Sequence, residues 1–118
     1  MYERYNIAGQ QAMGQGKFAN AEEQFKLALQ EAEQAGPKDP KLPSALNMLA
    51  NCYKQQGKFA EAEPLYKRAI EVKERAVGPF AKDLIPLYDN YANLLRASGR
   101  EAEAQKWEKK SRALFLAK

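Results

Sequence analysis

The sequence contains no histidine, and this absence excludes several kinds of chemistry at once. Histidine is the commonest general base in enzymes and the commonest ligand of zinc. The three serines, Ser44, Ser98 and Ser111, therefore have no histidine to activate them as nucleophiles. We expect a protein that is not an enzyme and that holds no metal ion.

Cysteine is almost as scarce, because Cys52 is the only one in the chain. A single cysteine can form no internal disulfide bond and no structural zinc site, which favours a reducing environment. Cys52 stands directly before Tyr53, in a stretch that reads as a helix packed on both sides. This position predicts a buried, unreactive thiol.

Long hydrophobic runs are also missing. No apolar stretch approaches the roughly 20 residues that cross a bilayer, and the polar start of the sequence lacks the apolar segment of a signal peptide. The motif GQGK at residues 14–17 has neither the spacing nor the Ser or Thr of a phosphate-binding loop. We therefore expect a cytoplasmic protein with no cofactor and no membrane partner.

Residues that favour β-strands are few, since the chain has two valines and no threonine. Ala, Glu, Lys, Gln and Leu dominate instead, and all five are strong helix formers. At 118 residues the chain has the common size of one domain. The composition predicts an all-α fold.

An internal repeat organises the sequence. Three segments that begin with glycine align without gaps at spacings of 41 and 42 residues: GKFANAEEQFKLAL from Gly16, GKFAEAEPLYKRAI from Gly57 and GREAEAQKWEKKSRAL from Gly99. A second matching segment precedes each glycine: YNIAGQQAMGQG, LNMLANCYKQQG and YDNYANLLRASG. Each repeat therefore has two parts that join at the glycine.

Both parts of each repeat read as helices. In the middle repeat, one apolar helix face has the spacing i, i+3, i+4 and i+7, at Leu46, Leu49, Ala50 and Tyr53. Glycine adopts the left-handed conformation that ends a helix, and the Gly-Pro pairs at 36–37 and 78–79 stop the second helix of a repeat. The pattern predicts six helices, at residues 2–15, 18–35, 41–56, 59–77, 81–98 and 100–117.

Small and aromatic residues predict how these helices pack. Small residues recur at equivalent places, which lets helices approach closely: Ala21, Ala62 and Ala104; Ala28, Ala69 and Ser111; Gly9, Ala50 and Ala92. Aromatic residues would fill the remaining spaces between helices: Tyr5, Phe18, Phe25, Tyr53, Phe59, Tyr66, Tyr88 and Tyr91. Pro64 falls inside a predicted helix, and we expect it close enough to the helix start for its missing N–H to cost little.

The net charge of +4 is unevenly distributed, with −2 over residues 1–36, +3 over residues 37–78 and +3 over residues 79–118. Such an imbalance could favour an acidic partner. The charges nevertheless alternate in sign along helix faces, as they do on solvated surfaces. Two pairs have the i, i+4 spacing of exposed ion pairs on a helix, Glu63–Lys67 and Glu71–Arg75.

The glycine, alanine and aromatic pattern of the repeat resembles that of tetratricopeptide repeats. The 42-residue spacing, the stretch LNMLANCYKQQGKFAEAEPLYKRAIEVKERAVGP and the proline in AEPLYKRA are similar to the longer variant found in kinesin light chains and many bacterial proteins. The resemblance covers nearly the whole chain and is weaker at its ends. In the last repeat, Glu101 and Glu108 replace Phe59 and Tyr66, which suits a terminal repeat with one exposed face. Trp107 would either cap the core or remain on the surface.

The resemblance implies a right-handed superhelical solenoid of three helix–turn–helix repeats in one domain, at about residues 2–36, 41–78 and 81–117. It further implies a module for protein–protein interaction. The first helix of each pair would line a concave groove that binds a peptide or protein segment. We expect either a monomer or weak end-to-end self-association.

Two alternatives stay open. The chain could be a structural or self-assembling unit of a longer repeat array, with weak end-to-end association. A less favoured alternative is a nucleic-acid surface on the last helix, where basic residues lie near Trp107 but three glutamates interrupt them. The basic residues are Lys106, Lys109, Lys110 and Arg112, and the glutamates are Glu101, Glu103 and Glu108.

Candidate ligand-binding residues follow from the phase of the first helices, on stripes rotated by about 100° from the apolar stripe. Side-chain amides there can bind a peptide backbone at its donors and its acceptors, and the cations would favour an acidic side chain or a C-terminal carboxylate. Ile7, Met13 and Met48 would supply adaptable apolar contacts. The equivalent rows are Asn6, Asn47 and Asp89; Gln10, Asn51 and Asn93; Met13, Lys54 and Arg96; and Ile7, Met48 and Asn90. The amides could instead only bridge adjacent helices and keep the stack in register.

Overall fold

The computed structural model describes residues 1–117, which form six α-helices, one short 3₁₀ helix and no strand. The elements are α1 (Tyr2–Gly14), α2 (Phe18–Gln34), α3 (Lys41–Gln55), α4 (Phe59–Val77), η1 (Lys82–Leu84), α5 (Ile85–Ala97) and α6 (Glu101–Leu116). Five of the six predicted helices agree with these bounds to within one residue at each end. The all-α prediction is therefore confirmed.

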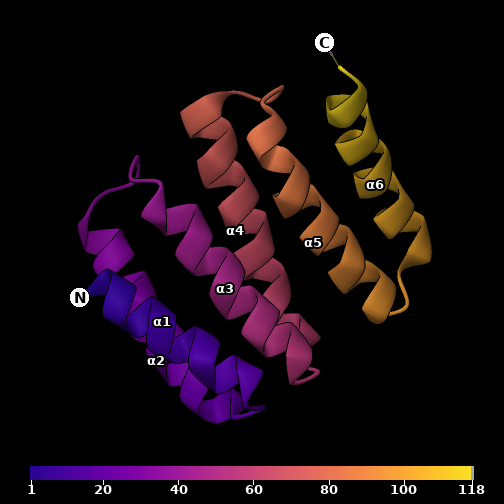
Figure 1. Cartoon of the computed structure of the whole chain (residues 1–118). Coiled ribbons are helices and arrows are strands. Elements are labelled where there is room, and N and C mark those ends of the chain that lie inside the picture. The colour runs from indigo at the N-terminus through magenta and orange to yellow at the C-terminus, as the bar shows by residue number, and fades with distance from the viewer. Residues whose placement is uncertain (118) are drawn as a thin grey trace.

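The helices stack in sequence order, and each one packs against the next along the chain. Figure 1 shows α1 in front of α2 and α3 in front of α4, so the first helices of the pairs run along one face. The two Gly-Pro loops lie at one end of the stack, and the turns within the pairs lie at the other. Among the described helices, none combines the length and the apolar character that a membrane crossing requires.

Glycine closes the turn inside each helical pair. Gly16, Gly57 and Gly99 have φ angles of 74°, 77° and 83°, a backbone conformation that costs other residues strain. In each case the residue after the glycine donates its backbone N–H to the carbonyl five residues earlier, which satisfies a helix-terminal acceptor. These bonds are Lys17 to Ala12 at 2.9 Å, Lys58 to Tyr53 at 2.9 Å and Arg100 to Leu95 at 2.8 Å.

One helix start was predicted wrongly. The expected helix at 81–98 begins only at Ile85, after an extended Ala81 and the 3₁₀ helix η1. Pro86 is the second residue of α5, where its missing N–H has no helical partner to lose. A start at residue 81 would make Pro86 the sixth residue, the position that Pro64 occupies in α4, so the extended Ala81 and not the proline alone sets this boundary.

Pro64 lies near the start of its helix, as expected. α4 begins at Phe59, and Pro64 is its sixth residue, beyond the turn whose N–H groups lack partners. The carbonyl of Ala60 therefore receives no helical N–H from residue 64. Ala60 and Pro64 are both exposed, so water can bind this carbonyl.

Small residues bring the helices together as expected. Ala21, Ala62, Ala69 and Ala104 are completely buried, and Ser111 is 6% exposed. Gly9 has the closest approach, because an added Cβ atom would lie only 2.4 Å from the ring of Phe25. Of the eight aromatic residues expected between helices, four are buried and four are half-buried: Phe25, Tyr66, Tyr88 and Tyr91, and then Tyr5, Phe18, Tyr53 and Phe59.

Cys52 is buried, as predicted, with 0% of its surface exposed. Its thiol donates a hydrogen bond of 3.4 Å to the backbone carbonyl of Phe18 on α2. Burial raises the pKa of the Cys52 thiol, which reduces the fraction of reactive thiolate. The low reactivity itself stays a prediction.

Candidate binding groove

The candidate residues of the first helices face two different surroundings. The structure places Gln10, Asp89, Asn93 and Arg96 on the exposed surface. The other polar candidates are partly buried: Asn6, Asn47, Asn51, Lys54 and Asn90. A glycine turn follows each of the three first helices, whereas only α3 and α5 begin beside a proline.

Three of the partly buried amides take part in contacts between helices. The Asn90 amide on α5 donates to Asn47 Oδ1 on α3 over 3.2 Å. The Tyr66 hydroxyl on α4 donates to Asn51 Oδ1 on α3. Burial raises the pKa of Tyr66, so the hydroxyl remains a proton donor. These two contacts match the alternative in which the amides hold the stack in register, although each amide keeps donors that the contact does not use.

The first-repeat end of the face is more open. The Gln10 amide donates to Asn6 Oδ1 over 3.2 Å within α1. Ile7 is 57% exposed, whereas Met13 and Met48 are partly buried. Ile7 therefore stands open to solvent, whereas Met13 and Met48 pack against the core cluster around Phe25 and Leu49.

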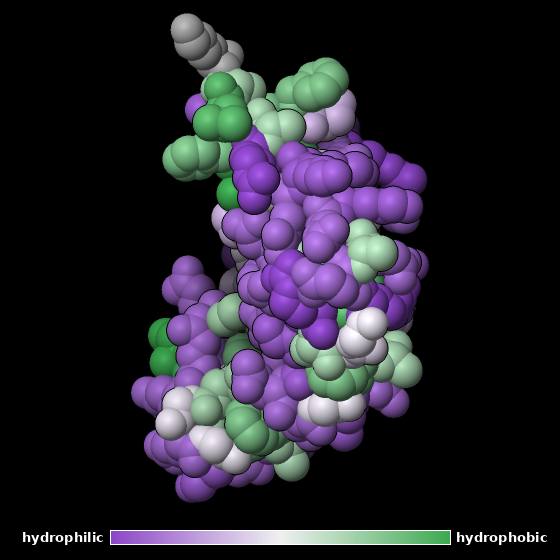
Figure 2. Space-filling model, turned by 90° about the vertical axis from the view of Figure 1, so that its right-hand side faces the viewer, coloured by the Kyte–Doolittle hydropathy of each residue, from purple (hydrophilic) through white to green (hydrophobic). Residues whose placement is uncertain are grey.

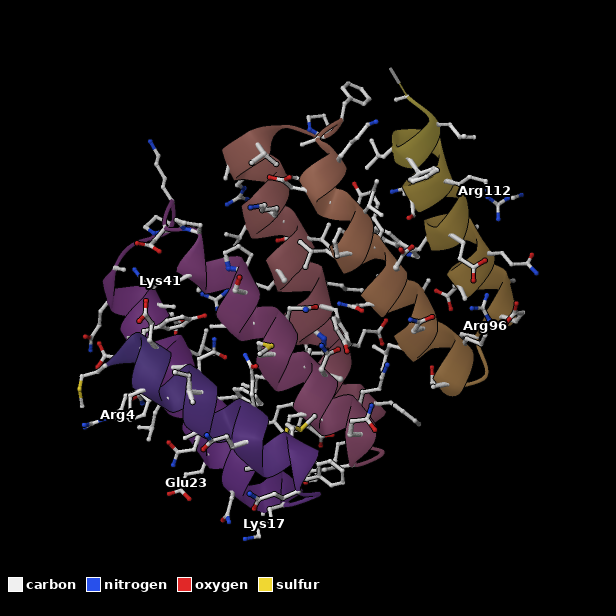
Figure 3. The ribbon with its side chains drawn as sticks, in the orientation of Figure 1. Arg4, Lys17, Glu23, Lys41, Arg96 and Arg112 are labelled. Atoms are coloured by element: carbon white, nitrogen blue, oxygen red, sulfur yellow. The ribbon has the colours of Figure 1, made fainter. Side chains whose placement is uncertain are left out.

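The two cations of the third row differ in their partners. Arg96 forms a bidentate ion pair with Glu101 at 2.8 and 3.2 Å, and it also pairs with Glu108. Its guanidinium is therefore committed to α6, and these contacts raise the pKa of Arg96. Figure 3 shows Arg96 beside the lower part of α6. Lys54 is partly buried and forms no ion pair with residues 1–117, which leaves it available to a ligand.

A hollow of about 350 Å³ opens between α3 and α5 on the same face. Pro43, Ser44 and Asn47 line it from α3, and Pro86 and Leu87 line it from α5. Lys73 reaches it from α4 and pairs with Asp83 of η1 over 3.8 Å. This long ion pair is loose, so both charges remain accessible to a ligand.

Sequence reasoning did not single out Ser44, Lys73 and Asp83, which line this hollow. Lys73 had one detectable signal, because it is a charged residue at the end of the otherwise apolar stripe of α4. Asp83 had none, since its position depends on the 3₁₀ helix η1. Within residues 1–117, no three Cys, Asp or Glu side chains gather in a way that could hold a metal ion.

Trp107 is the aromatic residue on which a nucleic-acid surface would depend. Its ring packs at 4.9 Å from Tyr91 and at 5.4 Å from Tyr88, and the Lys110 ammonium lies 4.2 Å from its centroid. Trp107 therefore packs against the core and caps it, which is one of the two places expected for it.

Comparisons with known proteins agree with the stacked helical hairpins of the fold. The family model described as "Tetratricopeptide repeat" matches twice, at residues 4–75 and 44–117. Among solved structures, BtubC (BKLC) from P. vanneervenii is similar with a TM-score of 0.88 and 26% sequence identity. That match covers 96% of this chain and 45% of BtubC, so the chain spans less than half the length of this relative. No protein with curated functional data matches the sequence.

Proposed function

Because this chain belongs to the tetratricopeptide-repeat family, and to its kinesin-light-chain-like type, we propose that the α1–α3–α5 face binds an extended peptide of a partner protein. Tetratricopeptide repeats generally serve protein–protein interaction. The observation that carries the proposal is the hollow of about 350 Å³ between α3 and α5, which combines apolar walls with accessible polar groups. We call the face around it the groove.

The groove offers both kinds of hydrogen-bonding group. The Ser44 hydroxyl and the Asn93 amide are exposed and form no side-chain hydrogen bond with residues 1–117. A hydroxyl and an amide each donate and accept, so they can pair with the N–H and C=O groups of an extended backbone. The Asn47–Asn90 bridge lies between them and fixes the spacing of α3 and α5.

Charge selects the ligand in this proposal. Lys54 and Lys73 place two ammonium groups along the groove, and Asp83 only loosely neutralises the second. Asp89 is exposed on α5 and adds one negative charge further along. We therefore expect peptides with an acidic residue near Lys54, and a carboxylate there would form a charge-assisted hydrogen bond.

The experiment is a selection of peptides from a random display library against the whole chain, followed by fluorescence anisotropy of the selected peptides. Ser44→Trp fills the hollow, and we expect affinity to fall by about tenfold or more, since tenfold equals about 1.4 kcal/mol. Ala60→Trp on the exposed side of α4 is the matched control and should leave affinity unchanged. The proposal fails if both tryptophan variants bind with the affinity of the original chain.

A second variant tests the charge. Lys54→Glu should weaken acidic peptides about fivefold or more, and the loss should shrink as salt screens the interaction. Asn51 is unsuitable for such a test, because its contact with Tyr66 also supports the fold. Equal binding of acidic and neutral peptides would remove the charge argument and leave the groove itself in place.

A further inference from the structure

Large exposed apolar side chains gather at one end of the stack. Val77 is 39% exposed, Phe80 84%, Phe115 69% and Leu116 69%. They come from the end of α4, the loop after it and the end of α6. Figure 2 looks onto α6 and shows hydrophobic residues collected at the top, above a mostly hydrophilic face. Exposed apolar residues that gather in this way mark interaction sites in soluble proteins.

Two hollows on this end are related by the repeat. The first has a volume of about 510 Å³ and lies between the α2–α3 loop and α4, lined by Pro37, Lys38, Val72, Arg75 and Ala76. The second has about 290 Å³ and lies between the α4–η1 loop and α6, lined by Glu74, Pro79, Phe80, Tyr88, Lys110, Ala113 and Leu114. Pro37 and Pro79, Lys38 and Phe80, and Val72 and Leu114 are pairs separated by 42 residues.

The two hollows share a ridge, the last turn of α4. Arg75 and Ala76 line the first hollow, and Glu74 of the same turn lines the second. We call the two hollows and this ridge the loop-end surface. Figure 1 shows both Gly-Pro loops and the end of α6 at this same end of the molecule. The groove hollow is lined by a different set of residues, so the loop-end surface is a second surface.

Cations outnumber carboxylates among the residues that line the loop-end surface. Lys38 and Arg75 form no ion pair within residues 1–117. Glu71 has the i, i+4 spacing from Arg75 but forms no ion pair with it. Lys110 lies over the rings of Trp107 and Tyr88 and likewise has no carboxylate partner there. The Glu74 carboxylate lies among them and accepts a hydrogen bond of 3.1 Å from the Tyr88 hydroxyl, so the surface carries three cations and one carboxylate.

The two hollows differ in the chemistry that they offer. In the first, two cations border an apolar floor formed by Val72 and Ala76. In the second, Phe80 replaces the equivalent lysine. Its wall is mainly aromatic and aliphatic, with one cation, Lys110, and one carboxylate, Glu74. The first hollow suits a carboxylate, and the second suits a large apolar side chain.

We propose that the loop-end surface is a second binding site, for an acidic segment of a partner protein that carries a large apolar side chain. The apolar side chain of the partner packs against Phe80 and Leu114. The partner segment then crosses the α4 ridge, so that its carboxylate lies beside Lys38 and Arg75. A helix is about 10 Å wide, and an extended chain advances about 3.3 Å per residue. The acidic and apolar residues of the partner therefore stand about three residues apart.

Peptides selected from a random display library against the whole chain test this proposal by their sensitivity to two sets of variants. Peptides of the loop-end class should contain an acidic residue about three positions from a large apolar one. Phe80→Ser and Arg75→Glu should each weaken them by about tenfold, which is the effect of losing a central contact. Ser44→Trp, which fills the groove, should leave these peptides unchanged. Phe80 and Arg75 are exposed, so neither change should lower the melting temperature.

The outcomes separate this proposal from the proposed function. If all selected peptides respond to Ser44→Trp and none to Phe80→Ser, the groove stands and the second site is overturned. If loop-end peptides are basic, or if Arg75→Glu strengthens them, the assigned partner is wrong. Two further measurements test other occupants of this surface. Sedimentation tests for a second copy of the chain, and binding to vesicles of anionic lipid tests for a lipid surface. Loss of self-association or of vesicle binding in Phe80→Ser, without peptide binding to the original chain, overturns the proposal in favour of a second copy or a lipid surface.

Discussion

The second helices of the middle and last repeats differ most where their surroundings differ. α4 packs against both α3 and α5, and its Tyr66 and Ile70 are 1% and 4% exposed. At the equivalent positions 42 residues later, α6 carries Glu108 and Arg112. Glu108 pairs with Arg96 instead of packing against another helix. The repeat thus specifies the hairpin, while the presence of a following helix determines whether these positions must be apolar.

The largest expected effect breaks the interior side of this comparison. Tyr66→Ala removes a buried aromatic ring and its contact with Asn51, and we expect the free energy of unfolding to fall by about 3–5 kcal/mol. Urea unfolding followed by circular dichroism measures this loss. Glu108→Ala at the equivalent place in α6 is the control, with an expected change within about 0.5 kcal/mol. Equal losses in the two variants would contradict the distinction between the two helices.

Overpacking should give the next largest effect. Ala62 is completely buried between helices of the middle repeat. Ala62→Leu should lower the free energy of unfolding by about 1–3 kcal/mol, because the larger side chain forces its neighbours apart. Ala60→Leu on the exposed side of the same helix should change it little. An unchanged melting temperature in Ala62→Leu would refute the close helix contact.

The first repeat offers a smaller and sharper test, since Gly9 replaces the Ala50 of the middle repeat. Gly9→Ala would bring a methyl group to 2.4 Å from the Phe25 ring. Overpacking costs about 1–3 kcal/mol and alanine gains about 1 kcal/mol in a helix, so a net loss of about 1 kcal/mol is expected. Gly14→Ala on the same helix meets no atom within 4 Å and should stabilise the fold slightly. Stabilisation in both variants would show that the Phe25 ring moves freely.

The smallest expected effect concerns the polar contact that joins α4 to the last repeat. The Glu63 carboxylate accepts two hydrogen bonds, one of 2.7 Å from the Arg100 guanidinium and one of 2.8 Å from the Tyr91 hydroxyl. The Arg100 hydrogen bond, with help from Tyr91, lowers the pKa of Glu63 despite partial burial. A carboxylate whose pKa is lower in the folded than in the unfolded state stabilises the fold at pH values above its unfolded pKa. That contribution disappears as the pH falls through its folded-state pKa.

Glu63→Gln should therefore destabilise the protein by about 1 kcal/mol at neutral pH and by less near pH 3. Urea unfolding at the two pH values measures the difference. Glu61→Gln, on an exposed residue of the same helix that forms no ion pair with residues 1–117, should retain the original pH dependence. If Glu63→Gln loses the same free energy of unfolding at both pH values, the contact stabilises the fold independently of the charge on Glu63.

Much of the fold could be predicted because its signals are local. Glycine at 16, 57 and 99 ends a helix through its own backbone freedom, so the turns followed from sequence spacing. Pro86 was harder, because a proline permits either an early helix start or a new one, and the extended Ala81 decides between them. Pro64 depends on its surroundings as well, because the Ala60 carbonyl that it leaves without a helical N–H is at an exposed part of α4, where water can bind it.

The candidate site could be predicted only as rows along single helices. The phase of α3 placed Asn47 and Asn51 next to the apolar stripe, but it gave no information on the partner that each amide contacts. Asn90 and Tyr66 occupy these amides from other helices. Lys73 enters the groove hollow from α4, a helix that the phase of α1, α3 and α5 does not describe. The groove-binding role of the rows stays a prediction.

The sequence alone determined the helices, their pairing and the glycine turns, because helix periodicity and backbone freedom act within a few residues. The tertiary structure decided which polar groups remain free for a partner. Arg96 and Lys54 are equivalent in sequence, yet α6 supplies two carboxylates to Arg96 and residues 1–117 supply none to Lys54. It also brought Phe80 to the end of α6, across more than 30 residues of chain. Contacts of this kind depend on the angle and distance between stacked helices, which no single segment encodes.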